Sequence, residues 1–438
     1  MPRGVRVLEL GCATGRLLAA TRPSYGLGID IDEKQIEAAR LIHAEENNLE
    51  FRVDNAEEMD FSGIEPFDYI IISDVLPLLH DVQSTLNRLQ AVCKPSTRLV
   101  ITYHSNVWRP VLKLATWIRR RQKDPNYNWL SSKDINNLLY LADYEMITQT
   151  GRTLLPLNVP LLGWFMNRFL AKMPLFSRFC LTWRIVARPK PAKTEFDESS
   201  VSIVIPTRNE RGNIEAAFLR TPRLGKWTEL IFVDGHSDDG TVEEIERCRN
   251  KYGSQWHRVE LLHQIGKGKG SAMRQGFAAC QGDILMILDS DLTMPPEELG
   301  KYYEAIIEDK GDFINGCRLI YPIEKQAMRF LNLIANHLFA NLFTWLLDQR
   351  IKDTLCGTKT LWRRDYENIA ANRTYFGDFD PFGDFDLLFG AAKLNLKIVD
   401  MPIHYRNRSY GDIKIHRWRH GLLLLRMSLK AFVKLKLS

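Results

Sequence analysis

The sequence predicts an α/β protein of two domains, each built around a mostly parallel sheet. Short β-branched strands alternate with helical segments on both sides of residues 188–200. That segment has two prolines, mixed charge and few apolar residues, which is typical of a linker. A chain of 438 residues also exceeds what one core ordinarily supports. We therefore predict domains over residues 1–187 and 201–415, followed by a basic amphipathic C-terminal helix over 416–438.

Composition and charge indicate the cellular compartment of the protein and the kind of surface that it contacts. The seven cysteines form no C-x-x-C pair, so neither a disulfide framework nor a zinc site is indicated, and we expect a reducing, cytosolic compartment. The first residues lack the pattern of a signal peptide, and every long apolar stretch is interrupted by charged or polar residues, so we expect no membrane span. From His404 onward, nine Lys or Arg residues stand against the single acid Asp412. This end of the chain favours an anionic surface.

In the first half, four successive strands end in polar residues. The strand Val5–Leu10 enters the tight turn Gly11–Gly15, whose small residues let a ligand approach the start of the following helix. The strands Tyr25–Asp30 and Leu49–Asp54 end in acids, and Phe67–Ser73 is followed by Asp74. An acid about 20 residues after a glycine-rich turn suits a ribose diol in a doubly wound sheet. A ligand is therefore expected at the carboxyl ends of these strands.

These residues resemble the successive motifs of class I S-adenosylmethionine-dependent methyltransferases, over about residues 5–187. The resemblance implies a Rossmann-like sheet and S-adenosylmethionine as cofactor. Gly11 and Gly15 would approach its methionine part, Asp30 its ribose hydroxyls and Asp54 its adenine amine, and Glu9 would also belong to the cofactor site. Ala13 departs from the family, which usually has glycine there.

The first half leaves two points open. A methyltransferase fold kept only as a scaffold is the alternative to an active enzyme, although Asp30 and Asp54 together favour cofactor binding. His80 and His104 follow the fourth and fifth strands, where catalytic groups can lie, but the sequence assigns neither of them as a base.

The second half repeats the sequence of strand, polar turn and helix. The strand Val201–Pro206 leads into Thr207–Glu210, and Leu230–Asp234 leads into a Gly-, Asp- and Ser-rich turn, in which Ser237 or Asp238 is expected to cap the next helix. The loop Gly266–Gly270 offers backbone amides and two lysines at a helix start, which suits phosphate. Its spacing is not that of a Walker loop.

The next strand, Asp283–Asp289, is an apolar run that ends in Asp289-Ser-Asp291. Two carboxylates this close repel each other unless a cation lies between them or their pKa values rise. A Mg²⁺ or Mn²⁺ ion held by Asp289 and Asp291 and by diphosphate oxygens would explain the pair. The alternative is a helix cap before Pro295.

Together, these four segments resemble the family 2 glycosyltransferases of the GT-A fold, over about residues 201–415. The resemblance implies a nucleotide-sugar donor and a metal ion. Asp289 and Asp291 would hold the metal and the donor diphosphate. The residues expected at the donor are Pro206, Glu210, Asp234, Gly268 and Gly270, with Glu210 and Asp234 at the nucleoside. The usual Asp-Asp-Gly-Ser motif is changed here at Gly235 and His236.

Later segments resemble the acceptor side of the dolichol-phosphate mannose synthase branch, namely residues 353–359, 385–388 and 405–414. The resemblance implies an inverting transfer to a polyprenyl phosphate whose phosphates are held by Lys359, Arg408 and Lys414. A phosphate oxygen is already anionic, so it needs positioning more than a base. A glycan hydroxyl would instead need a carboxylate to take its proton, with Asp384 or Asp386 as candidates.

Two segments suit a membrane surface. Residues 328–347 form an apolar helix interrupted by Asn332, Asn336, His337 and Asn341, which predicts an amphipathic segment. Residues 417–436 mix apolar residues with cations, as interfacial helices do. Packing against the catalytic domain or a second subunit is the alternative for both, and nucleic acid is disfavoured because no recognition motif accompanies the charge.

The sequence thus predicts a peripheral enzyme on the cytoplasmic face of a membrane. Two rivals stay open. The first half could be a non-catalytic module that docks the transferase on a partner, or the second half could be a nucleotidyltransferase of related fold. The Pro206–Glu210 opening disfavours the latter.

Overall fold

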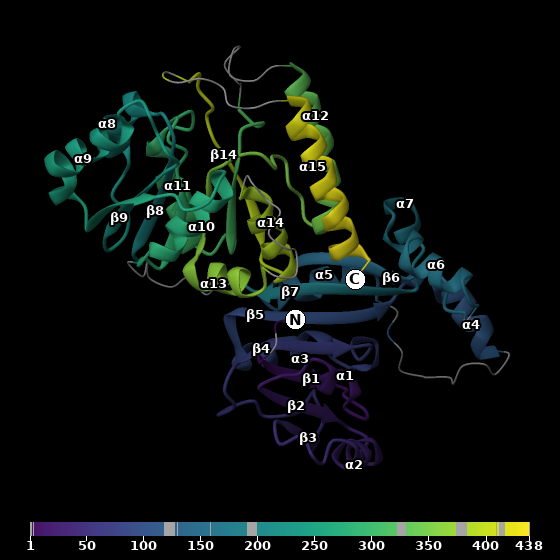
Figure 1. Ribbon diagram of the computed structural model, residues 1–438. Coiled ribbons are helices and arrows are strands. Elements are labelled where there is room, and N and C mark those ends of the chain that lie inside the picture. The colour runs from purple at the N-terminus through teal and green to yellow at the C-terminus, as the bar shows by residue number, and fades with distance from the viewer. Residues whose placement is uncertain are drawn as a thin grey trace. The chain divides into compact units, whose positions relative to one another are not determined.

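The computed structural model describes residues 2, 4–117, 128, 130–157, 159–190, 199–321, 330–373, 383–408, 410 and 417–437. The chain divides into two compact units, Met1–Ala192 and Lys193–Ser438 (Figure 1). The division falls within the segment expected as a linker. The expected linker began two residues too early, because Arg188 and Pro189 end a strand of the first unit and Arg188 is fully buried beside Glu145.

The first unit has a mixed seven-stranded sheet in the order β3-β2-β1-β4-β5-β7-β6. The first five strands in this order are parallel, and β7 runs antiparallel to both β5 and β6. The strands are β1 (Arg6–Leu10), β2 (Tyr25–Asp30), β3 (Leu49–Val53), β4 (Phe67–Ser73), β5 (Cys93–His104), β6 (Tyr144–Thr153) and β7 (Thr182–Pro189). The crossovers place the carboxyl ends of β1, β2, β3, β4 and β5 at one edge of the sheet.

Helices connect these strands, and apolar side chains of the sheet pack against them to form the core of this unit. The helices are α1 (Arg16–Ala20), α2 (Glu33–Ile42), α3 (Val82–Leu89), α4 (Arg109–Trp117), α5 (Ser132–Leu141), α6 (Leu162–Arg168) and α7 (Pro174–Ser177). The last two lie in the connection between β6 and β7, away from the sheet (Figure 1).

The second unit also has a mixed seven-stranded sheet, in the order β10-β9-β8-β11-β13-β12-β14. Its strands are β8 (Val201–Thr207), β9 (Thr228–Asp234), β10 (Arg258–His263), β11 (Ile284–Ile287), β12 (Phe313–Cys317), β13 (Lys359–Trp362) and β14 (Ile398–Pro402). β8, β9, β10 and β11 are mutually parallel, and β13 runs antiparallel to β11 and β12. β11 is a fully buried central strand, as its unbroken apolar run predicts.

Helices pack on this second sheet around two buried apolar clusters. They are α8 (Arg211–Arg220), α9 (Thr241–Tyr252), α10 (Lys269–Ala279), α11 (Leu299–Ile307), α12 (Phe330–Leu347), α13 (Arg363–Ala371), α14 (Asp384–Lys393) and α15 (Arg417–Ala431). None of the helices in the described part of the chain is long and apolar enough to cross a bilayer.

The two segments expected at a membrane surface both contribute to the core of the second unit. Met427 and Ala431 of α15 are buried, and Phe432 after it lies 5.5 Å from the ring of Trp345 at the end of α12. Asn336 of α12, expected on a polar face, is buried and donates to Asp353 Oδ1 over 3.4 Å. The packing alternative therefore holds for one face of each helix.

Candidate active sites

The turn after β1 gives the first unit a crowded backbone site. Gly11 and Gly15 have φ values of 68° and 71°, which favour glycine. A Cβ on Gly11 would lie 2.2 Å from Val75 Cγ2, and one on Gly15 would lie 2.4 Å from the Phe51 ring. Ala13 has φ 45°, in the left-handed region that favours glycine, which gives a physical reason for the family's usual residue there.

Three acids, Asp30, Asp54 and Glu9, lie at the edge of the sheet that carries this turn. Asp30 Oδ2 accepts from Ala13 N over 2.8 Å, and its Oδ1 accepts from Asp32 N over 3.0 Å. Asp54 lies at the end of the neighbouring strand and accepts from Asn55 N over 2.7 Å. The structure thus brings together, at the edge where β1, β2 and β3 end, the acids that the sequence predicted for the cofactor.

Glu9 is the most unusual of these acids. Its side chain is buried, and its Oε2 atom has no hydrogen-bond partner within the described region. Burial raises the pKa of its carboxyl to about 7; the charge of Asp30 adds to this, and a hydrogen bond from the Leu18 backbone opposes it. A buried carboxyl oxygen without a donor leaves a place for a cationic or donating ligand group.

The two histidines left unassigned by the sequence lie in different settings. His104 ends β5, and its Nδ1 lies 4.0 Å from Oδ1 of Asp74, which follows β4. His80 is exposed in the turn before α3. Asp74 precedes Val75, the residue against Gly11, so the His104 and Asp74 pair lies near the cofactor turn.

In the second unit, Asp234 and Glu210 are both buried at the carboxyl ends of β9 and β8. Asp234 accepts from the backbone N–H groups of His236 and Ser237 over 3.1 and 3.2 Å. His236 has φ 61°, so it occupies a backbone conformation that suits the glycine of the usual motif. Glu210 Oε2 accepts from Asn213 Nδ2 over 2.8 Å.

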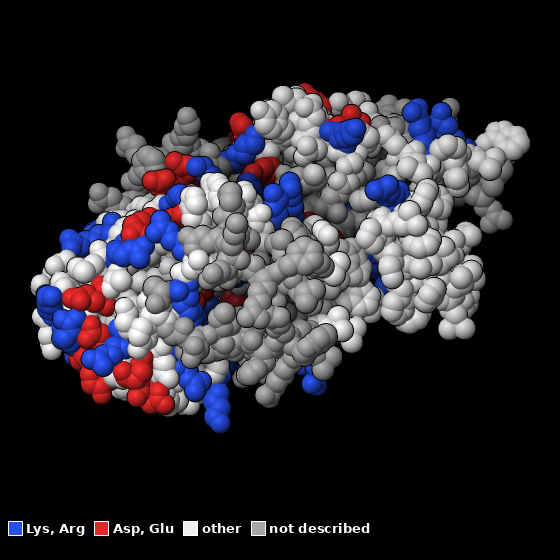
Figure 2. Space-filling model, turned by 90° about the horizontal axis from the view of Figure 1, so that it is seen from above, with Lys and Arg blue, Asp and Glu red and all other residues white. Residues whose placement is uncertain are grey.

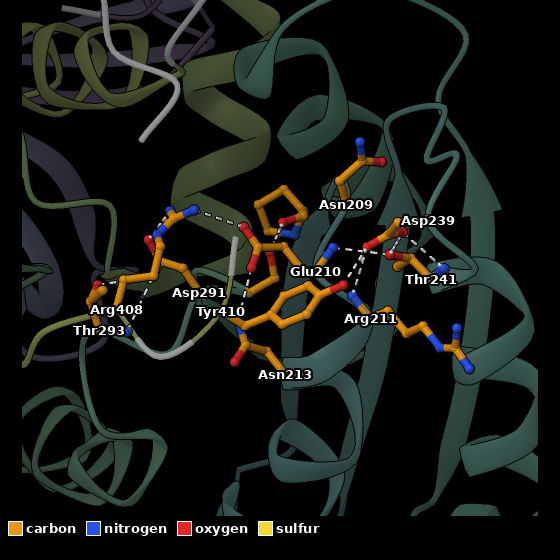
Figure 3. Close-up of polar contacts among 12 residues, drawn as sticks. Asn209, Glu210, Arg211, Asn213, Asp239, Thr241, Asp291, Thr293, Arg408 and Tyr410 are labelled. Carbon is orange, nitrogen blue, oxygen red and sulfur yellow. Dashed lines mark hydrogen bonds and ion pairs between the residues drawn. The ribbon is translucent and has the colours of Figure 1, made fainter. Parts of the chain in front are cut away.

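The loops after β8 and β9 are joined side by side. Asn209 donates to Asp238 Oδ1 over 2.7 Å and accepts from Asp238 N over 3.0 Å, while Asn209 N donates to Ser237 Oγ over 2.9 Å. The expectation that Ser237 or Asp238 caps α9 is therefore wrong. These side chains hold the first loop instead, and Asp239 accepts from the N–H of Thr241 at the helix start (Figure 3).

Pro206, Gly268 and Gly270 lie in the segments that the sequence predicted for the donor, and their contact with a donor stays a prediction. The carbonyl of Pro206 accepts from Ser290 Oγ over 2.9 Å, which ties β8 to the segment that carries the two aspartates. Gly268 precedes α10 with φ 81°, and Gly270 approaches Gly383 so closely that a Cβ on Gly383 would lie 2.9 Å from its Cα. Helix α10 thus starts against the start of α14.

The two aspartates after β11 are each paired with a cation. Lys269 Nζ lies 2.5 Å from Asp289 Oδ1, and Arg408 Nη2 donates to Asp291 Oδ2 over 2.6 Å. Arg408 also donates to Glu210 over 3.2 Å, so its guanidinium joins the carboxylates after β8 and β11 (Figure 3). Partial burial opposes ionisation of Asp289, yet Lys269, Lys359 and Arg318 hold its pKa below the ordinary value.

This donor set suits a hard divalent ion that substrate oxygens help to hold. Within the described residues, no group of three or more His, Cys, Asp or Glu side chains could hold a metal. Two carboxylates with diphosphate oxygens are nevertheless the usual Mg²⁺ arrangement, because this ion keeps few protein ligands. Asp289 and Asp291 fit that role, with Lys269 and Arg408 balancing their charge.

The acceptor-side segment is held from beneath by a buried ion pair. Arg318 forms two parallel hydrogen bonds of 2.7 and 2.8 Å with Asp353, which also accepts from the Leu355 N–H. Gly357 of this segment lies against the Asp289 and Lys269 pair, since a Cβ there would be 2.1 Å from Asp289 Oδ2 and 2.3 Å from Lys269 Nζ. Only glycine fits at this contact without displacing the pair.

The other acceptor residues are paired within the protein. Lys359 is fully buried, lies 3.1 Å from Asp384 Oδ1 and donates to the carbonyl of Cys356. Asp386 accepts from Arg373 Nε over 2.8 Å. Direct phosphate contacts by Lys359 and Arg408 stay predictions, and Lys414 lies outside the described residues.

Sequence reasoning missed several partners that shape this site. Arg318 and Arg373 were not singled out, and neither was Tyr410, whose ring lies against Gly212 and whose hydroxyl lies 3.4 Å from Asp239 Oδ2. Lys269 was expected at a phosphate, but not as the partner of Asp289. The sequence shows which segments carry cations and which carry acids, but it does not show which of these residues pair.

Comparison with known proteins follows the division into units. Residues 2–151 match a methyltransferase domain family, and residues 202–369 match glycosyl transferase family 2. The dolichol-phosphate mannosyltransferase of Pyrococcus furiosus is 36% identical over 221 residues, which are 49% of this chain and 59% of that protein. An undecaprenyl-phosphate 4-deoxy-4-formamido-L-arabinose transferase of Klebsiella pneumoniae is 33% identical over 220 residues, 49% of this chain and 62% of that protein. The chain thus spans about three fifths of these two relatives.

Solved structures similar to the chain include methyltransferases. The magnesium protoporphyrin IX methyltransferase of Synechocystis with bound SAH is 17% identical, with a TM-score of 0.31, over 43% of this chain and 75% of that one. An S-adenosylmethionine-dependent methyltransferase of Mesorhizobium loti is 15% identical, with a TM-score of 0.35, over 43% and 93% of the two chains. By its family matches, the chain carries a methyltransferase domain followed by a family 2 glycosyl transferase domain.

Proposed function

We propose that the second unit transfers a sugar from a nucleotide-sugar donor to a polyprenyl phosphate and that the first unit is an S-adenosylmethionine-dependent methyltransferase. The observation that carries the proposal is the meeting of Glu210, Asp234, Asp289 and Asp291 at the carboxyl edge of one sheet, with Lys269 and Arg408 among them. Glu210 and Asp234 would hold the nucleoside, and the cations would face the diphosphate.

The residues of the second unit would act by positioning and charge balance. A phosphate oxygen of the acceptor attacks the anomeric carbon, the bond from that carbon to the diphosphate breaks, and the nucleoside diphosphate leaves with the electron pair, which inverts the configuration. Asp289 and Asp291 would hold a Mg²⁺ or Mn²⁺ ion, which would neutralise charge on the leaving diphosphate when bound. Lys269 and Arg408 lie beside these aspartates, where they can contact the same oxygens.

The acceptor assignment rests on the names of the relatives and on the pairing of two acids. The similar proteins are named for dolichol phosphate and undecaprenyl phosphate. A glycan hydroxyl would need a carboxylate base, but Asp384 and Asp386 already have ion pairs with Lys359 and Arg373. An anionic phosphate needs no such base. This arrangement favours the polyprenyl phosphate over a surface glycan or glycolipid.

The first unit would bind the methyl donor at the β1 turn. Gly11 and Gly15 allow close approach, Asp30 would accept from the ribose hydroxyls, and Asp54 from the adenine amine. The Glu9 Oε2 atom, without a partner among the described residues, would face the cationic methionine part directly or through water. The bound cofactor would supply the methyl group.

The exposed face of α15 and of the helical turn Phe432–Lys436 after it supports contact with the cytoplasmic face of a membrane. Leu425, Leu429 and Val433 are exposed at helical spacing, and the cations Arg426, Lys430 and Lys434 each follow one of them. Such a face suits an anionic lipid surface. The proposed acceptor is a lipid of that surface.

Transfer is tested with the full chain, a set of nucleotide sugars and a polyprenyl phosphate, by mass spectrometry of the lipid product and by release of nucleoside diphosphate. Asp291→Asn should lower transfer about a hundredfold or more, because it removes a charge at the diphosphate, and should leave S-adenosylmethionine affinity unchanged. Glu246→Gln, which removes a surface ion pair of α9, is the control. Retained transfer in the Asp291 variant would refute the metal site, and pyrophosphate release would instead support nucleotidyl transfer.

Methyl-donor binding is tested by calorimetry. Asp30→Ala should weaken S-adenosylmethionine binding at least about tenfold through loss of the ribose contact, a difference of about 1.4 kcal/mol. Glu37→Gln on the exposed side of α2 is the control. Unchanged affinity in the Asp30 variant would make the first unit a scaffold.

A further inference from the structure

The first unit carries a surface that neither proposed activity uses. Helix α4 follows β5, and α6 and α7 lie in the connection between β6 and β7; the three helices lie together at one end of this unit (Figure 1). We call the outer side of these helices the helical patch. Its large apolar side chains are exposed, among them Trp117 at 81%, Leu161 at 83%, Trp164 at 61% and Leu175 at 66%. Exposed apolar side chains on a folded protein are usually scattered, and a cluster of them indicates an interaction surface.

The helical patch is held in place from its inner side. The side chain of Asn167 accepts from the N–H groups of Leu154 and Leu155 over 2.8 Å and donates to the carbonyl of Leu155 over 2.8 Å. Trp108 Nε1, just before α4, donates to the carbonyl of Phe179 over 2.7 Å, which joins α4 to the segment after α7. Ala171 and Cys180 are buried beneath. The exposed rings and aliphatic groups therefore lie on helices that these contacts join to the rest of the unit.

The charge of the helical patch has one sign. The segments 105–117 and 151–181 contain no Asp or Glu. Their cations are Arg109, Lys113, Arg152, Arg168, Lys172 and Arg178. In Figure 2 this end of the first unit is white with scattered blue, whereas the surface over α8 and α9 of the second unit mixes blue with red. Apolar and aromatic groups among cations match the boundary between anionic headgroups and acyl chains.

We propose that the helical patch is a membrane-contact surface that inserts its apolar side chains into the interface of an anionic lipid bilayer. Self-association fits less well, because a symmetric dimer through the same face would bring its cations against each other. The inference is separate from the C-terminal helix and does not depend on either activity.

The position of the helical patch gives this contact a consequence for the first unit. His104 and Thr153 both align with Thr182, so the chain leaves β5 and β6 for the patch at the same end of the sheet. That end is also the carboxyl end of β1 and β2, where Gly11 and Asp30 lie. The consequence rests on the proposed methyl-donor site, which lies at this same end of the sheet. A methyl acceptor embedded in the bilayer would therefore approach the methyl-donor site from the membrane side.

The experiment is flotation of the full chain with vesicles of phosphatidylcholine alone and of phosphatidylcholine with phosphatidylglycerol. The patch variant combines Trp164→Ser with Leu175→Ser, and its control combines Leu41→Ser with Ile265→Ser, which are apolar residues elsewhere that are even more exposed. A third variant, Lys430→Glu with Lys434→Glu, removes cations of the C-terminal helix. Thermal unfolding checks that each variant is folded.

The wild type should bind the anionic vesicles, and the patch variant should bind them at least tenfold more weakly, both alone and combined with the C-terminal variant. The control should bind like the wild type, and vesicles of phosphatidylcholine alone should bind less than the anionic ones. Wild-type binding by the patch variant, or no vesicle binding by the wild type, would overturn the proposal. A shift of molar mass from dimer to monomer on patch substitution, without loss of lipid binding, would instead assign the face to a second copy.

Discussion

The two candidate sites differ in how their acids are balanced. In the first unit, the buried Glu9 keeps an oxygen without a partner in the described part of the chain, and burial raises its pKa to about 7. In the second unit, Asp289 and Asp291 are each paired with a cation, and the pKa of Asp289 is lowered although its partial burial opposes ionisation. The carboxyl of Glu9 thus lacks a compensating charge, whereas the carboxylates of Asp289 and Asp291 are already neutralised by Lys269 and Arg408. Two similar parallel strand edges therefore differ in how their acids are compensated.

Among the changes that test this contrast, crowding the Asp289 and Lys269 pair should have the largest effect after Asp291→Asn. Gly357→Ala would place a Cβ 2.1 Å from Asp289 Oδ2 and 2.3 Å from Lys269 Nζ, so the pair must shift. Since a misplacement of about 1 Å can cost about a hundredfold in rate, sugar transfer should fall by roughly that factor, measured as released nucleoside diphosphate. The control is Gly300→Ala on α11, where a Cβ meets nothing within 4 Å. Full activity of Gly357→Ala would show that the aspartate and lysine pair is not part of the site.

Two glycines of the first unit, Gly11 and Gly63, allow the effect of steric crowding to be separated from the effect of a positive φ. Gly11→Ala should lower S-adenosylmethionine affinity at least about tenfold, because both its φ of 68° and the side chain of Val75 oppose a Cβ. Gly63→Ala is the matched control, with φ 77° and nothing within 4 Å. It should cost about 1 to 2 kcal/mol of stability at most and leave affinity unchanged. Equal affinity of both variants, read by calorimetry, would contradict a cofactor at this turn.

The protonation of Glu9 should make the stability of the first unit depend on pH. The folded carboxyl has a pKa of about 7, above its ordinary value of 4.5, so the folded state binds more protons between these values. Stability should therefore fall as the pH rises through this window, by on the order of 1 to 3 kcal/mol. Glu9→Gln removes this term. Its melting temperature should match the wild type near pH 4 and exceed it near pH 8 without cofactor. Parallel melting curves for both proteins across this range would refute the unpartnered buried acid.

The smallest effect is expected at Ala13. Its φ of 45° is strained for alanine and easy for glycine, so Ala13→Gly should change stability by less than about 1 kcal/mol, in the stabilising direction. Thermal unfolding of this variant beside Ala19→Gly, within α1, gives the contrast, because glycine in a helix is destabilising. A destabilised Ala13→Gly would mean that the alanine methyl contributes packing that outweighs its backbone strain.

Residues at strand ends were the part of this protein that the sequence predicted well. Asp30, Asp234 and Asp289 could be placed because a parallel sheet brings the carboxyl ends of its strands to one edge. Pairs between distant segments could not be placed. Arg408 meets Glu210 across 198 positions in the chain, and Arg188 is buried beside Glu145 although a charged residue near prolines predicts a linker. Periodicity gives the direction of a side chain, but not its partner.

The sequence predicted only part of the environment of helices α12 and α15, again because it does not show the partners of their side chains. The cations of α15 predicted contact with a membrane surface, which stays a prediction for its exposed face, whereas Met427 and Ala431 are buried in the core of the second unit. Asn336 looked like a solvent-facing interruption of α12, whereas it donates to the buried Asp353. A polar residue in an apolar helix marks either water or a buried partner, and local sequence does not distinguish them.

The most direct test of the contrast between the units is calorimetric titration of the full chain with S-adenosylmethionine, UDP and GDP, each with and without Mn²⁺. S-adenosylmethionine should bind with the same affinity in both conditions, and one of the two nucleotides should bind more tightly with Mn²⁺. Asp291→Asn should remove the Mn²⁺ dependence, and Asp30→Ala should weaken only the methyl donor. Nucleotide binding that changes with neither Mn²⁺ nor the Asp291 substitution, or methyl-donor binding that is unchanged by Asp30→Ala, would contradict the proposed division of ligands between the two units.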